Sequence, residues 1–136
     1  MEKLAVIGLG LIGGSMALDL KKRLNYKVLG IDNNSEHIQK ALELGIIDKA
    51  ATFEDLTDVD VVIVAVPVDK IAEVSSQVLD VISNNTLVFD VGSVKKIYVT
   101  SLIHILKERT LLRLILWRGR SFQGLKRHYQ TCLIRK

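Results

Sequence analysis

Short apolar runs alternate with amphipathic segments along the first part of the chain. The runs contain Val and Ile without polar alternation, which predicts strands buried on both faces of a sheet; they lie at residues 3–8, 27–32, 58–68 and 86–91. The segments between them repeat apolar residues every three or four positions, which predicts helices. In the first of these helices, one face carries Ile12, Met16, Leu20 and Leu24. Strands that alternate with helices predict an α/β domain with a doubly wound parallel sheet.

The second helix is expected at residues 34–45. Asn34 or Ser35 is the predicted N-cap, and Gly45 is the residue expected just past the helix end. Its core-facing side is expected to hold Ile38, Ala41, Leu42 and Gly45. We expect His37 to face solvent and assign it no catalytic role.

Three glycines follow the first strand at the spacing G-x-G-x-x-G: Gly8, Gly10 and Gly13. In this pattern the first permits a tight turn, the second lets a pyrophosphate approach the backbone, and the third lets the helix pack closely on the strand. The amino end of the helix, at Leu11 and Ile12, adds free N–H groups and a partial positive charge for the phosphates. The pattern is typical of a Rossmann-type dinucleotide-binding domain. A glycine-rich turn without a ligand is the alternative.

An acidic residue, Asp32, ends the second predicted strand. An acid at this position accepts hydrogen bonds from the ribose hydroxyls of adenosine. Its charge repels a 2′-phosphate, and neither Asn33 nor Asn34 is basic. We therefore expect NAD as the cofactor rather than NADP. The alternative is that Asp32 only caps a helix or a turn.

Ligands of doubly wound sheets bind beyond the carboxyl ends of the strands. The Gly8 turn, Asp32, the Val66–Pro67 turn and Ser93 all follow predicted strands at such ends. Four separated segments thus predict one cofactor site. The alternative for Ser93 is a hydroxyl that only stabilises its own turn.

Charge divides the chain at residue 97. Residues 1–96 carry 10 Lys and Arg with 14 Asp and Glu, whereas residues 97–136 carry 9 Lys and Arg with 1 Glu, so the net charge of +4 averages two different parts. The longest apolar run is too short to cross a bilayer, and the first residues show no signal-peptide pattern. Cys132 is the only cysteine, which excludes an internal disulfide and a cysteine-cluster metal site. We expect a cytoplasmic protein without a metal site.

Four segments resemble the nucleotide-binding domain of the prephenate dehydrogenases of tyrosine biosynthesis: VIGLGLIGGSMALDLKK, VLGIDNN, VVIVAVPV and VFDVGSVK. The resemblance covers residues 3–96, so we place the dinucleotide-binding domain at residues 1–96. It implies NAD-dependent oxidative decarboxylation of prephenate to 4-hydroxyphenylpyruvate, in which a histidine takes the hydroxyl proton. It implies that Ser93 helps to hold that histidine and the substrate hydroxyl. Arogenate is the alternative substrate. The family is homodimeric through a helical domain that we expect to be absent here.

The family pattern continues with H-P-M-A-G-T-E, which carries the catalytic histidine, but residues 97–136 show no such motif. One interpretation is a non-catalytic dinucleotide-binding module whose basic arm docks on an anionic partner. Arg113, Arg118 and Arg120 interrupt the apolar cluster of this tail, so we expect neither a nucleic-acid nor a membrane arm. A divergent end of the domain is a second interpretation.

The third interpretation is that the tail is translated in a wrong reading frame. The last base of each codon, joined to the first two of the next, permits F-V-A-A-H-P-M-A-G-T-E from Thr110 onward. Leu114–Ile115 as CTC-ATC contains CAT, a histidine codon, and Leu116–Trp117 as CTA-TGG contains ATG. We favour a one-base shift shortly after Lys96, which leaves the tail without an assigned domain and the chain without its catalytic base. The sheet would then end at residue 91 with an exposed apolar edge.

Overall fold

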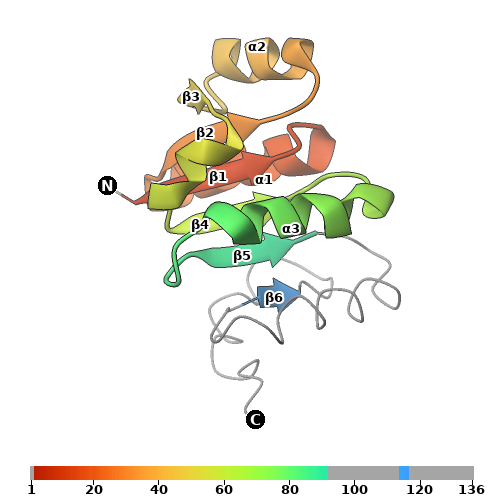
Figure 1. Ribbon diagram of the computed structural model, residues 1–136. Helices are drawn as coiled ribbons and strands as arrows, with labels where there is room; N and C mark the ends of the chain where they lie inside the picture. The colour runs from red at the N-terminus through yellow and green to blue at the C-terminus, as the bar shows by residue number, and fades with distance from the viewer. Residues whose placement is uncertain (1, 92–113, 117–136) are drawn as a thin grey trace.

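The computed structural model describes residues 2–91 and 114–116. Six strands form one sheet in the order β3-β2-β1-β4-β5-β6, and every neighbouring pair is parallel (Figure 1). The strands are β1 (Lys3–Ile7), β2 (Lys27–Ile31), β3 (Lys49–Ala50), β4 (Val61–Val64), β5 (Leu87–Asp90) and β6 (Leu114–Leu116). The helices of the described residues are α1 (Leu11–Leu24), α2 (Ser35–Glu43) and α3 (Ile71–Val81), with 3-10 helices η1 (Phe53–Asp58) and η2 (Val68–Lys70). The predicted doubly wound parallel sheet is confirmed.

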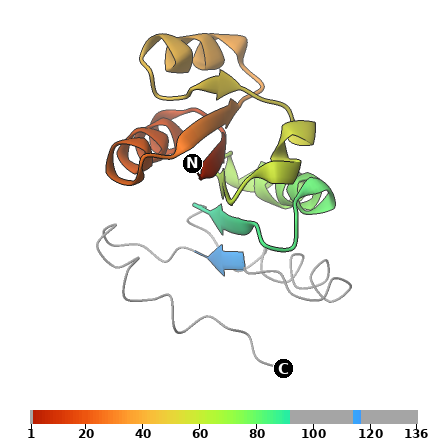
Figure 2. The ribbon, with the colours of Figure 1, turned by 90° about the vertical axis from the view of Figure 1, so that its left-hand side faces the viewer.

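Helices cover both faces of the sheet (Figure 2). Successive side chains of a strand point to opposite faces, so Leu4 and Val6 of β1 belong to one core cluster and Ala5 and Ile7 to the other. Helices α1 and α2 cover the first face, and α3 and η1 cover the second. Both faces of β1 are therefore buried, which explains why its sequence is apolar without alternation.

Helix α1 packs on the sheet through its small residues. The buried positions of this helix are Gly13, Gly14 and Ala17. Met16 and Leu20 pack against the same core cluster from the side. Ile12 and Leu24, from the predicted apolar face, are 61% and 52% exposed. The glycines bring the helix axis close to β1, so the contact face is centred on them rather than on the large side chains.

Helix α2, Ser35–Glu43, lies within the predicted range 34–45. The Asn34 side chain accepts a hydrogen bond from the Glu36 amide at 2.9 Å, which confirms it as the N-cap. Gly45 follows the helix with a φ of +65°, a conformation that favours glycine. The prediction for the core-facing side was wrong for Leu42, which is 42% exposed, and for Gly45. Ile47, beyond the helix, is buried beside Gly30 and covers the sheet instead.

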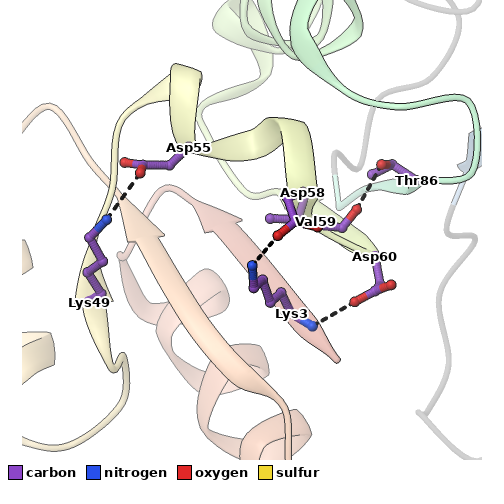
Figure 3. A network of polar contacts seen from close by, with 7 residues as sticks. All are labelled: Lys3, Lys49, Asp55, Asp58, Val59, Asp60 and Thr86. Carbon is purple, nitrogen blue, oxygen red and sulfur yellow. Dashed lines mark hydrogen bonds and ion pairs between the residues drawn. The ribbon is translucent and has the colours of Figure 1, made fainter. Parts of the chain in front are cut away.

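Polar contacts tie η1 and the loops to the amino ends of the strands (Figure 3). Lys3 donates its amide to Asp60 Oδ2 at 2.7 Å, and its ammonium group pairs with Asp58. The buried Thr86 hydroxyl donates to the Val59 carbonyl at 2.8 Å. The starts of β1 and β5 are therefore linked to the loop before β4, at the amino ends of the strands, opposite the glycine turn.

The strand β6 was not expected. Leu114–Leu116 pair in parallel with Val88–Asp90 of β5. The expectation that the sheet ends at residue 91 with an exposed edge is therefore wrong. An unpaired strand offers a row of backbone donors and acceptors, and any extended segment that reaches it satisfies them, whatever its side chains.

Candidate nucleotide-binding site

The glycine turn lies at the point where the strand order reverses. The chain leaves β1 toward β2 on one side, while β4 lies on the other side of β1. A Cβ added to Gly8, whose φ is +92°, would lie 2.5 Å from the Ala65 carbonyl oxygen, so the turns after β1 and β4 are in direct contact. Doubly wound sheets bind their ligands at this point, beyond the carboxyl ends of the strands.

The amino end of α1 is exposed at this point. Gly10 is the N-cap, it supplies no side-chain cap, and the first turn holds no acidic residue. The first amides of a helix lack intrahelical acceptors and carry its partial positive charge. A Cβ added to Gly10 would meet no atom within 4 Å, whereas one added to Gly13 would lie 1.8 Å from the Gly8 carbonyl oxygen. Gly13 is therefore needed for packing, and the space over Gly10 fits an anionic group.

Asp32 connects the end of β2 to the glycine turn. Its Oδ2 accepts a hydrogen bond from the Leu9 amide at 2.7 Å, and its Oδ1 accepts one from the Asn34 amide at 2.8 Å. The second bond stabilises the turn before α2, as the structural alternative for this residue required. An ionised carboxylate has about four acceptor sites, so acceptor capacity is left for a sugar hydroxyl.

The same contacts keep Asp32 ionised. Burial raises the pKa of the Asp32 carboxyl, but hydrogen bonds from the Asn34 and Leu9 amides, with a contact to His37, outweigh it and hold the pKa below its ordinary value. A carboxyl whose pKa is lowered by folding stabilises the fold above its unfolded pKa. That contribution is lost as the pH falls through the lower, folded pKa.

Replacement of Asp32 by alanine should therefore have a pH-dependent cost. At pH 7 we expect the free energy of unfolding to fall by about 1–3 kcal/mol, because a charged acceptor for two amides is removed. The difference from wild type should shrink below about pH 4, as the wild-type carboxylate becomes protonated. Urea unfolding at pH 7 and pH 3 measures this difference, with Asp69→Ala as the control, since Asp69 is an exposed aspartate. An equal cost at both pH values would contradict the assigned contacts.

The structure brings together three of the four predicted segments. The Gly8 amide donates to the Ile31 carbonyl at 2.8 Å, next to Asp32, and Gly8 contacts the turn that leads to Val66 and Pro67. Pro67 is exposed and precedes η2. Ser93 lies outside the described residues.

One neighbour of the site was missed from the sequence. His37 Nδ1 lies 3.3 Å from Asp32 Oδ2, although His37 was expected only to face solvent. Its side chain is 49% exposed, and that of Asp32 is 7% exposed. The available signal was positional, because the first turn of a helix lies close to the end of the strand that precedes it.

Away from this site, the described residues contain a hollow, but no metal-binding cluster and no helix that could cross a membrane. A hollow at the amino ends of the strands is lined by Lys3, Lys27, Leu29, Lys49 and Asp55, at the edge opposite the glycine turn. No three His, Cys, Asp or Glu side chains gather in residues 2–91 in a way that would hold a metal ion. In the described part of the chain, every helix is too short or too polar to cross a membrane.

The doubly wound sheet, the glycine turn at the strand-order reversal and the acid at the end of β2 define a Rossmann-type nucleotide-binding domain. Sequence comparison identifies the family of this domain. The family description "Prephenate dehydrogenase, nucleotide-binding domain" matches residues 16–113. The chain belongs to the prephenate dehydrogenase family. The matched range extends past residue 96, the predicted domain boundary.

Relatives support this assignment in sequence and in structure. The prephenate dehydrogenases of Lactococcus lactis subsp. cremoris and Bacillus subtilis are 37% and 36% identical over 99 residues, which are 70% of this chain and 27% of each relative. The chain thus spans about a quarter of the length of these curated relatives. The prephenate dehydrogenase of A. aeolicus, solved with hydroxyphenyl propionate and NAD+, superposes with a TM-score of 0.74 at 34% identity over 85% of this chain and 41% of that one. Synechocystis arogenate dehydrogenase gives 0.70 at 28% identity over 76% and 37%.

Proposed function

We propose that this chain binds NAD and corresponds to the cofactor domain of a prephenate dehydrogenase. The observation that carries the proposal is the Asp32 carboxylate, held at 2.7 Å from the Leu9 amide of the glycine turn. Dinucleotide binding requires a sugar acceptor beside the open amino end of α1, and a carboxylate at this position supports the proposal. The NAD+ complex of the A. aeolicus relative supports the same cofactor.

Each part of the site has a distinct role in this proposal. The amides at Leu11 and Ile12 hold the pyrophosphate over Gly10, where no side chain intervenes. Asp32 accepts the ribose hydroxyls and repels a 2′-phosphate. Val66 and Pro67 border the cofactor from the β4 side. Bound NAD supplies the hydride acceptor of the reaction.

The substrate side rests on the family. We propose oxidative decarboxylation of prephenate to 4-hydroxyphenylpyruvate for the intact protein, with Ser93 next to the catalytic histidine and the substrate hydroxyl. Arogenate is the second candidate substrate, and the likeness to Synechocystis arogenate dehydrogenase favours its inclusion in any assay. The present chain is proposed to be inactive, because no in-frame H-P-M-A-G-T-E motif supplies the histidine.

Binding of NAD to the full chain tests the cofactor proposal. We expect saturable NAD binding by calorimetry, weaker NADP binding, and at least about a tenfold loss of NAD affinity in Asp32→Ala, a change of about 1.4 kcal/mol. The loss reflects the missing acceptor for the ribose.

Loss of the bond from the Leu9 amide to Asp32 could loosen the glycine turn, which would weaken the binding of NAD and NADP alike. The preference for NAD over NADP is therefore the decisive quantity. Asp32→Ala should weaken the binding of NAD more than that of NADP, because the charge that repels the 2′-phosphate of NADP is removed as well. Asp69→Ala serves as the control. Absence of NAD binding by the folded wild-type chain, or an unchanged preference in Asp32→Ala, would contradict the proposal.

A further inference from the structure

His37 is the one titratable side chain that the structure places against the proposed ribose acceptor within the described residues. It lies in the first turn of α2, and its Nδ1 is 3.3 Å from Asp32 Oδ2. The same oxygen accepts the Leu9 amide, so the imidazole, the carboxylate and the glycine turn form one connected group. We propose that His37 is a specificity-determining residue, whose protonation weakens the discrimination against NADP. This inference rests on the proposed binding of NAD.

The charge state of His37 decides how strongly Asp32 acts on a 2′-phosphate. A neutral imidazole can donate its Nδ1 hydrogen to Oδ2, which orients the carboxylate and leaves its full negative charge. A protonated imidazole keeps that hydrogen bond and adds a positive charge beside the carboxylate. The net charge of the pair then rises from −1 to 0, so a 2′-phosphate beside Asp32 meets less repulsion.

The exposure of the two side chains favours this role. Asp32 is 7% exposed and fixed by two amides, whereas His37 is 49% exposed. The imidazole is thus open to solvent while it touches a carboxylate that two backbone amides hold. A histidine changes its charge between about pH 5 and pH 8, where Asp32 remains ionised because its pKa is lowered.

Other charges near His37 are few and of both signs. On α2 itself, Glu36 precedes it and Lys40 lies one turn later. Asp32, which follows β2, is the charged group in contact with His37. On β3, Lys49 lies at the amino ends of the strands, away from this site, and is paired with Asp55 at 3.1 Å. The first turn of α1 carries no acidic side chain. Asp32 is therefore the charge to which protonation of His37 couples most directly.

The test compares the ratio of the dissociation constants for NADP and NAD at pH 8 and pH 6, with the full chain. Free 2′-phosphate is itself protonated near about pH 6, which lowers the ratio in every variant. The informative quantity is therefore the difference between variants. His37→Gln keeps a donor for Asp32 but never carries a charge. We expect the ratio to fall between pH 8 and pH 6 by about two- to fivefold more in wild type than in this variant.

A permanent positive charge at position 37 should make the ratio of dissociation constants independent of histidine protonation. In His37→Lys the ratio at pH 8 should already be about two- to fivefold below that of wild type. Gln39→Lys is the matched control, because it adds the same charge to an exposed position of the same helix and should leave the ratio as in wild type.

The outcomes separate this inference from the proposed function. Equal pH effects in wild type and His37→Gln, or equal ratios in His37→Lys and Gln39→Lys, would overturn the role of His37 while NAD binding stands. A folded wild-type chain that binds no NAD at pH 8 would overturn both.

Discussion

Replacement of Gly13 by alanine is expected to destabilise the fold by at least about 3 kcal/mol. The added Cβ would lie 1.8 Å from the Gly8 carbonyl oxygen, which is backbone and has no rotamer to adopt. Overpacking of a core by a methyl group costs about 1–3 kcal/mol when side chains give way, so a clash with backbone should reach or exceed that range. Thermal and urea unfolding followed by circular dichroism measure the loss.

Gly10→Ala is the matched control for this substitution. A Cβ there meets no atom within 4 Å, so we expect the free energy of unfolding to change by less than about 1 kcal/mol. The same methyl group occupies the space proposed for the pyrophosphate, and NAD affinity should fall by about tenfold or more. A stable Gly13→Ala variant would refute the packing role of Gly13, and unaltered NAD binding by Gly10→Ala would refute the position of the pyrophosphate.

Repair of the reading frame is expected to have the largest effect on activity. A gene with the proposed one-base shift after Lys96 corrected should encode H-P-M-A-G-T-E and catalyse prephenate-dependent NADH formation. A positioned general base contributes about 10²–10⁴ in rate, so the uncorrected chain should fall below the repaired one by at least that factor. Absorbance at 340 nm follows NADH, and parallel assays with prephenate and arogenate identify the substrate.

Two variants of the repaired protein are the controls. Replacement of the restored histidine by asparagine should return the rate to that of the present chain while NAD binding persists. Ser93→Ala should lower the rate less, because a positioning hydroxyl is lost and the base remains. Codons in the gene that are incompatible with H-P-M-A-G-T-E would refute the frame shift.

The sheet was predictable because its strands carry a strong and local signal. Val61–Val64 is apolar at every position, and a run of that kind between turns has few uses other than a strand buried on both faces. The glycine spacing likewise specified where the helix must approach the strand. Both features are set by neighbours in sequence.

The errors have a common physical origin in contacts made across the fold. Ile12 was placed on the apolar face of α1, but the approach allowed by Gly13 moved the contact to small residues. Leu42 was predicted in the core, but Ile47, from beyond the helix, is buried there instead. His37 touches Asp32 because of the path of the turn between them, and no periodicity encodes that path.

The pairing of β6 with β5 shows how a sheet can accommodate a segment of altered sequence. A sheet edge recognises an incoming strand through the peptide groups that every residue shares, and three residues occupy it here. Under the proposed frame shift, three residues outside the original reading frame pair with the sheet of a domain of the prephenate dehydrogenase family. We expect this pairing to reduce association of the chain with its own copies through the edge of β5.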